Sequence, residues 1–132
     1  GHPNQVAPGK RPFHTIIPGF AFHQGEPFMS FGVMGGHMQA QGHVQMMIRI
    51  IGHGQNPQAA SDAPRWHLTE SGALALESGF DPKTVQKLRS RGHDILLDQP
   101  EHLFGGAQLI ARHDTGYCAA SDHRKEGIAA GF

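Results

Sequence analysis

Two adjacent glycines, Gly35 and Gly36, lie where a short apolar run gives way to a helical pattern in the stretch FGVMGGHMQAQGHVQ. A helix that begins directly after Gly36 leaves its first backbone N–H groups without partners inside the helix, and the helix dipole adds partial positive charge there. Glycine lets an anion approach such amides because no Cβ stands in the way. The pair therefore fits an oxyanion site for acyl transfer, although by itself it is most simply a strand-to-helix turn. No Gly-Lys-Ser/Thr follows, which excludes a Walker P-loop.

The stretch from 40 to 51 has the apolar spacing of an amphipathic helix. We expect this helix to be largely buried, with its apolar face packed on the hairpin that precedes it. The polar positions Gln41, Gln45 and Arg49 are expected to form a solvated edge, or a surface that other parts of a larger protein cover. The apolar face consists of Ala40, Val44, Met47, Ile48 and Ile51, widened by Met46 and Ile50.

Local turn and cap signals mark several other elements. The runs PFHTIIPGFAF and PFMSFGV predict a β-hairpin that turns at HQGE, with a bend or bulge at Pro18 and Gly19 in its first strand. Asn56 and Asp81 each precede a proline, which is the start signal of a helix. Gly92 supplies the left-handed residue that ends the second of these helices.

Four short apolar segments, ALALESG, DILLDQ, AQLIARHD and GYCAASD, predict strands, and HDTG joins the last two as a hairpin. Helices grouped between hairpins favour an α+β fold with a largely antiparallel sheet. Residues 1–132 are expected to form a single domain, since this length matches one modest core. Arg65 is interpreted as a structural residue that could pair with Asp62.

Composition narrows the classes of partner. The 11 Lys and Arg residues balance the 11 Asp and Glu residues, so neither nucleic acid nor an anionic membrane is expected as a partner. No apolar run reaches the roughly 20 residues that a membrane-spanning helix needs. The single cysteine, Cys118, excludes an internal disulfide, and the 11 histidines are scattered. His37 and His43 do not share a helical face, so we expect neither a metal site nor another cofactor.

Four blocks of sequence resemble the gamma-glutamyltranspeptidase family: PGKRPFHTIIP, SFGVMGG, NPQAASDAPRW and YCAASDHRKEGIAAGF. They occur in the family's order and extend from Pro8 to Phe132. The chain is identified as the C-terminal part of the small subunit. The forms that two of these blocks take here, GKRPFHTIIP and FGVMGG, resemble those of the amidohydrolase and acylase branch. The resemblance implies an autoprocessed proenzyme of the N-terminal-nucleophile hydrolases, whose αββα sandwich is incomplete in this fragment.

The resemblance also implies site residues. In the family, amides at the positions of Gly35 and Gly36 form the oxyanion hole, and a Ser-Ser pair binds the α-carboxylate of the substrate. That pair aligns with His14 and Thr15 here. Thr15 keeps a hydroxyl, whereas the imidazole of His14 is bulkier and can donate, accept or carry charge. The acyl group can therefore differ from that of glutathione, and the alternative for His14 is a strand histidine facing solvent.

The family's nucleophile is a threonine at the start of the small subunit, and no threonine of this chain occupies that position. We therefore expect the isolated chain to be inactive, and its partners to be the large subunit, the N-terminal part of the small subunit and a gamma-glutamyl or related amide. The compartment, cytoplasmic or periplasmic, stays open. Two alternatives remain: a non-catalytic interaction module that pairs with another copy through exposed strand edges, and a His-rich metal-binding domain.

Overall fold

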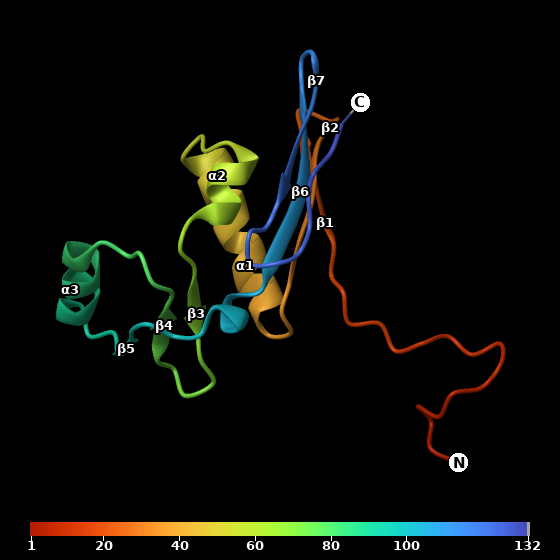
Figure 1. Cartoon of the computed structure of the whole chain (residues 1–132), viewed down its shortest axis with the longest axis horizontal. Helices are drawn as coiled ribbons and strands as arrows, with labels where there is room; N and C mark the ends of the chain where they lie inside the picture. The colour runs from red at the N-terminus through yellow and green to blue at the C-terminus, as the bar shows by residue number, and fades with distance from the viewer. Residues whose placement is uncertain (132) are drawn as a thin grey trace.

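A computed structural model describes residues 1–131, which form two β-sheets and three α-helices. The larger sheet is antiparallel, with strand order β1-β2-β6-β7, and the smaller one has the order β3-β4-β5 (Figure 1). The strands of the larger sheet are β1 (Gly19–His23), β2 (Glu26–Met34), β6 (Gly106–His113) and β7 (Gly116–Ser121), and those of the smaller sheet are β3 (Trp66–Leu68), β4 (Leu74–Leu76) and β5 (Ile95–Leu96).

The helices α1 and α2 lie on one side of the larger sheet, while α3 lies beyond the smaller sheet (Figure 1). Residues 16–18 and 128–130 lie along the opposite face of the larger sheet, while the N-terminal end of the chain extends away from it (Figure 1). The helices are α1 (Met38–Met47), its π-helical extension η1 (Ile48–Gly52), α2 (Pro57–Asp62), α3 (Pro82–Ser90) and the 3-10 turn η2 (Glu101–Phe104).

The main core lies between α1 and the larger sheet. Alternate residues of β2 point inward, as the two-residue repeat of a strand requires, and join the buried Met46 and Ile50 of the helix in one cluster. The other face of the sheet carries large apolar side chains in contact with solvent. The inward residues of β2 and β6 are Met29, Phe31, Val33, Ala107, Leu109 and Ala111, and the exposed ones across the sheet include Phe20, Phe22, Met34, Ile110 and Tyr117.

Gly42 allows α1 to approach β2 closely. A Cβ at this position would lie 2.5 Å from Cγ1 of Val33. Alanine normally favours a helix by about 1 kcal/mol over glycine, but forcing an atom into a packed contact costs about 1–3 kcal/mol. We therefore expect Gly42→Ala to lower the urea midpoint of unfolding, whereas Gly52→Ala, whose nearest atom is 3.9 Å away, keeps or raises it. A Gly42→Ala chain as stable as the Gly52→Ala chain would contradict this packing.

The predicted orientation of the 40–51 helix is wrong. Val44, Ile48 and Ile51 are each at least half exposed, whereas Gln45 is only 3% exposed. Met46 and Ile50, which widened the predicted apolar face, are buried in the core as expected, and the partly buried Met47 packs against it. The helix is thus turned so that part of its polar face is buried.

Hydrogen bonds to backbone groups explain this orientation. The Gln41 side chain accepts from the Leu68 N–H at 2.7 Å and donates to the Leu68 carbonyl at 3.2 Å. Gln45 makes the same pair of bonds to Trp66, at 3.0 and 2.9 Å. The two side-chain amides therefore satisfy alternate residues of β3 as a neighbouring strand would. These four bonds hold Gln41 and Gln45 against β3, so Val44, Ile48 and Ile51 point away from the strands.

Most local predictions are confirmed. The hairpins formed by β1 with β2 and by β6 with β7 are present. The Asn56 side chain accepts from the Ala59 N–H, and that of Asp81 from the Lys83 and Thr84 N–H groups, as N-caps do. None of the helices described in residues 1–131 is long and apolar enough to cross a bilayer.

Three details differ from the predictions. The first strand begins only at Gly19, because Pro18 has no N–H to give to a ladder. Its register shift falls between Ala21 and Phe22 instead of at Pro18 and Gly19. The short strand β3 was not predicted, since its three residues give no periodic pattern. The pairing of β4 with β5 is parallel, and these strands form a second sheet instead of joining the first.

Candidate oxyanion turn and its surroundings

The Gly35–Gly36 turn joins the end of β2 to α1. Both glycines have positive φ, +133° and +59°, and their carbonyls accept from the Met38 and Gln39 N–H groups, each at 3.1 Å. Gly35 is also tightly packed, because a Cβ there would lie 2.9 Å from Cα of Gly105. Outside the strand ladders, no hydrogen bond among residues 1–131 uses the N–H of Gly35 or Gly36 as donor. Both residues are exposed, so these two donors are available at the positive end of α1.

The Gln39 side chain links this turn to the segment that carries His14 and Thr15. Its Nε2 donates to the Thr15 carbonyl at 2.9 Å and to the Gly36 carbonyl at 3.3 Å. Its Oε1 accepts from the Ile17 N–H at 3.2 Å. The structure thus brings Thr15 next to Gly36 although 21 positions separate them, while the side chains of both His14 and Thr15 stay exposed.

A groove of about 550 Å³ borders the turn on the open face of the larger sheet. The segment Ile16–Pro18 and the segment Ile128–Ala130 line it together with residues of β2, β6 and β7. Met34 and Gln39 also line this groove, which places the turn at its edge. Its surface is largely apolar, so it suits an apolar group or another element of the protein better than a charged ligand.

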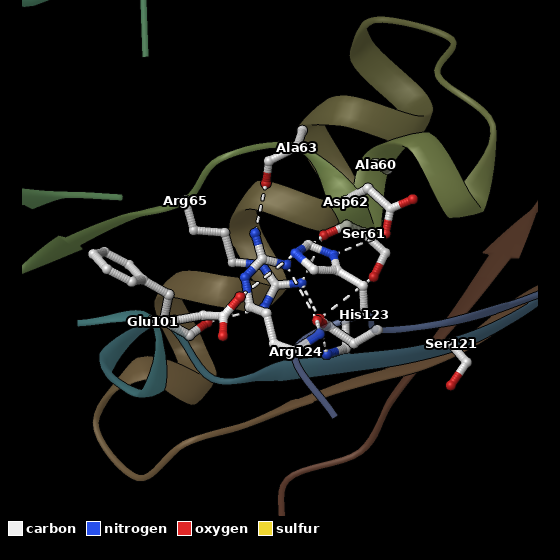
Figure 2. Close-up of polar contacts among 12 residues, drawn as sticks. Ala60, Ser61, Asp62, Ala63, Arg65, Glu101, Ser121, His123 and Arg124 are labelled. Carbon is white, nitrogen blue, oxygen red and sulfur yellow. Dashed lines mark hydrogen bonds and ion pairs between the residues drawn. The ribbon is translucent and has the colours of Figure 1, made fainter. Parts of the chain in front are cut away.

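A buried cluster of charged residues lies between α2 and the C-terminal segment. Arg65 and Arg124 both donate to the Ser61 carbonyl, at 3.0 and 2.9 Å (Figure 2). Glu77 accepts from Arg124 at 2.6 Å through both of its oxygens, and Asp122 pairs with Arg65 through an Nη2–Oδ2 contact. Two arginines are thereby matched by two carboxylates in a region that excludes water.

Asp122 is the centre of this cluster. Its side chain is fully buried and accepts from the N–H of Ala107 at 2.6 Å and of Arg124 at 2.9 Å, as well as from Arg65. Burial alone would raise the pKa of Asp122, but these N–H groups and the Arg65 guanidinium outweigh it and hold the pKa below its usual value. Asp122 therefore stays ionised and fastens the end of β7 to β6 and α2.

Arg49 lies at the border of the same cluster and donates to the carbonyls of Ala60, Ala63 and Pro64. Burial, with added repulsion from Arg65 and Arg124, lowers the pKa of Arg49 to about 10. Arg49 therefore remains charged at neutral pH. It acts as a charged hydrogen-bond donor to these carbonyls and not as an acid or a base.

Arg65 was predicted to pair with Asp62, and this is wrong. Arg65 binds Asp122, while Asp62 accepts from Gln58 at 2.9 Å and lies 3.1 Å from Nδ1 of His123. The Asp62 side chain is exposed, whereas the Arg65 side chain is wholly buried. Sequence reasoning missed the role of Asp122, whose only signal was its place in the last of the four resembling blocks.

In the described residues 1–131, no three His, Cys, Asp or Glu side chains are arranged as metal ligands would be. The scattered histidines lie in different elements. The buried Nε2 of His43 has no hydrogen-bond partner, and its ring packs against that of Phe31 with centroids 5.0 Å apart. Burial lowers the pKa of His43, which favours its neutral form.

The similarity of this chain to known proteins extends over its whole length. The family model for gamma-glutamyltranspeptidase matches residues 1–132, the whole chain. The chain belongs to the gamma-glutamyltranspeptidase family. It is 37% identical to the oxamate amidohydrolase proenzyme of Klebsiella pneumoniae and 33% identical to the glutathione hydrolase-like YwrD proenzyme of Bacillus subtilis, with 96% and 99% of this chain covered.

The solved structures place this family member in the acylase branch. The crystal structure of cephalosporin acylase from Bacillus halodurans is 45% identical and superposes with a TM-score of 0.83 over 95% of this chain and 24% of that chain. The chain spans about a quarter of the length of the two curated proenzymes, 25% and 26%. Its α+β fold is part of the N-terminal-nucleophile hydrolase sandwich, as predicted.

Proposed function

We propose that this chain is the C-terminal part of the small subunit of an N-terminal-threonine amidohydrolase or acyltransferase that cleaves gamma-glutamyl or related amide bonds. The observation that carries the proposal is the Gly35–Gly36 turn, whose N–H groups donate to no acceptor outside the strand ladders among residues 1–131 and lie at the start of α1. Relatives that match nearly the whole chain include an amidohydrolase, a glutathione hydrolase-like protein, a glutathione hydrolase and an acylase.

In this reaction the nucleophilic threonine comes from a part of the protein outside these 132 residues. Its hydroxyl oxygen attacks the amide carbon, and its own amine takes the hydroxyl proton and passes it to the leaving amine. The carbonyl oxygen becomes an oxyanion in the tetrahedral intermediate. The N–H groups of Gly35 and Gly36 donate to that oxyanion, and because their backbone is already folded they need no rearrangement when charge develops. Water or an acceptor amine then releases the acyl group.

The segment that carries His14 and Thr15 binds the acyl part of the substrate. The Thr15 hydroxyl donates to a substrate carboxylate, and the His14 imidazole adds a second donor. Both side chains are exposed in this chain, and the Gln39 bridge keeps the segment near Gly36. A substrate held by its carboxylate would therefore have its amide carbon near the oxyanion turn.

The open face of the larger sheet is the surface that meets the rest of the enzyme. Phe20, Phe22, Ile110 and Tyr117 are each more than half exposed on it. Monomeric proteins rarely leave such a continuous apolar area in water. We infer that the large subunit and the N-terminal part of the small subunit cover this face and complete the sandwich. These two parts would also form the remaining walls of the active site.

The edges of the same sheet support the second candidate function, a non-catalytic interaction module. The outer strands β1 and β7 each have one edge without a strand partner in the described residues, and a second copy could pair with either edge. This candidate differs from the first in what the complete protein does, because an interaction module gains no hydrolytic activity when the rest of the protein is present.

The pure chain is expected to release no measurable product from a chromogenic gamma-glutamyl anilide, because it lacks the attacking group and the base. The complete proenzyme, once expressed and processed, is expected to hydrolyse an amide of this class. Absorbance of the released aniline measures the activity of the pure chain and of the processed proenzyme. Turnover by the pure chain that Thr15→Ala abolishes would place the nucleophile in this chain and overturn the proposal. A processed proenzyme without amidase activity would favour the interaction module.

A further inference from the structure

We propose that Gln39 is a positioning residue that sets the distance between the carboxylate-binding segment and the oxyanion turn, and so determines how strongly the enzyme prefers acyl groups that carry a carboxylate. This inference rests on the function proposed above. Gln39 touches neither a reacting atom nor the substrate in this scheme, and it acts only through Thr15, Ile17 and Gly36.

The segment before β1 depends on this one side chain. All hydrogen bonds found between residues 1–18 and the rest of the described chain use Gln39. The other bonds of this segment, such as those of Lys10 to the carbonyls of Pro3 and Gln5, stay within it. Van der Waals contacts along the groove can hold the segment against the sheet, but they are not directional and do not fix its register.

The orientation of the Gln39 amide is determined by its partners. The Ile17 N–H needs an acceptor, and the carbonyls of Thr15 and Gly36 need donors, so Oε1 must face Ile17 and Nε2 must face the two carbonyls. Both Nε2 hydrogens are then used, one for the Thr15 carbonyl of the segment and one for the Gly36 carbonyl of the turn. A displacement of the segment by the length of one peptide group would break the bonds to Thr15 and Ile17 and leave only the bond to Gly36.

This bridge spans the two places where the substrate would be held. A carboxylate on the acyl group would be bound beside Thr15, and the amide oxygen beside Gly36, so the distance between the two anchors must match the acyl chain. An acyl group without a carboxylate uses only the second anchor. Loss of the bridge should therefore weaken catalysis for carboxylate-bearing substrates more than for their carboxylate-free counterparts.

Gln41 offers a matched control on the same helix. It also makes two backbone hydrogen bonds through its side-chain amide, but to Leu68 of β3, away from Thr15. Gln39→Met and Gln41→Met each replace an amide by a side chain of similar length that cannot form these bonds. Gln39→Glu is a further variant, because it keeps the acceptor for Ile17 but loses both donors.

The experiment compares two anilides on the complete, processed enzyme: the gamma-glutamyl anilide and the 4-aminobutanoyl anilide, which differs only by lacking the α-carboxylate. The ratio of their kcat/KM values cancels the fraction of active enzyme. We expect the wild type to prefer the gamma-glutamyl anilide, and Gln39→Met and Gln39→Glu to lower that ratio by about 10-fold to 100-fold. Gln41→Met should change the ratio less than about 2-fold, since it acts on both substrates equally.

Each outcome separates this inference from the proposed function. A processed wild type that hydrolyses neither anilide overturns the proposed function and the inference with it. A wild type that hydrolyses both equally overturns the carboxylate site. A wild-type preference that survives both Gln39 variants overturns the inference alone. Failure of both Gln39 variants to process, while Gln41→Met processes normally, also overturns it, because Gln39 would then be needed for folding instead of for the substrate ratio.

Discussion

Replacement of Asp122 by alanine is expected to lower the free energy of unfolding by about 3–5 kcal/mol, because it leaves the buried guanidinium of Arg65 without its counter-charge. Both side chains are fully buried, so water cannot replace the lost carboxylate. The N–H groups of Ala107 and Arg124 lose their acceptor as well. A domain of this size has only about 5–15 kcal/mol of stability, so this loss removes a large share of it and should lower the urea midpoint of unfolding strongly.

Urea unfolding followed by the fluorescence of Trp66, the chain's single tryptophan, measures this effect. The matched control is Glu26→Ala, which removes the carboxylate of the exposed pair between Glu26 and Arg112 at 3.1 Å. Exposed pairs contribute about 0–1 kcal/mol, so this control should leave the midpoint nearly unchanged. Equal destabilisation by the two variants would show that the buried cluster adds no more than a surface ion pair.

The pH dependence of the same measurement follows from the lowered pKa of Asp122. A carboxylate whose pKa is lower in the folded state stabilises the fold above its unfolded pKa, and this stabilisation is lost as pH falls through the folded pKa. The stability difference between the wild type and Asp122→Asn should therefore be constant near neutral pH and shrink below about pH 4. A difference that does not change in acid would mean that Asp122 is not ionised in the folded chain.

Replacement of Gly35 by alanine is the second large effect, and we expect it to lower the free energy of unfolding by at least about 2 kcal/mol. Two causes act together. The φ of +133° lies outside the range that a side chain tolerates, and the new Cβ would lie 2.9 Å from Cα of Gly105, a backbone atom that cannot move away alone. The strand-to-helix turn would have to change shape.

Gly36→Ala is the matched comparison. Its φ of +59° is the ordinary left-handed conformation, and no atom lies within 4 Å of the position that a Cβ would take. The cost should be about 1–2 kcal/mol, the usual penalty for a left-handed residue other than glycine. Urea unfolding of both variants gives the difference, and a Gly36→Ala chain less stable than Gly35→Ala would show that the turn is not packed against Gly105 as described.

The local elements of this protein follow from short-range sequence patterns. The Asn56 and Asp81 caps, the turn between β1 and β2, and the start of a helix directly after Gly36 were all predicted correctly, since each depends on residues a few positions apart. Resemblance of four short blocks was sufficient to identify the family, which the comparison over residues 1–132 confirms.

Contacts between distant segments determine which side of α1 is buried, what Arg65 binds and what holds Thr15 beside Gly36. The helix pattern favoured burial of Val44, Ile48 and Ile51, which are exposed. Gln41 and Gln45 face β3 instead, because they bind backbone groups of that strand more than twenty positions away. Asp122 follows Arg65 by 57 positions. Side-chain bonds to distant backbone groups leave no periodic signal in a sequence, because any glutamine or arginine can form them and only the fold determines which one does.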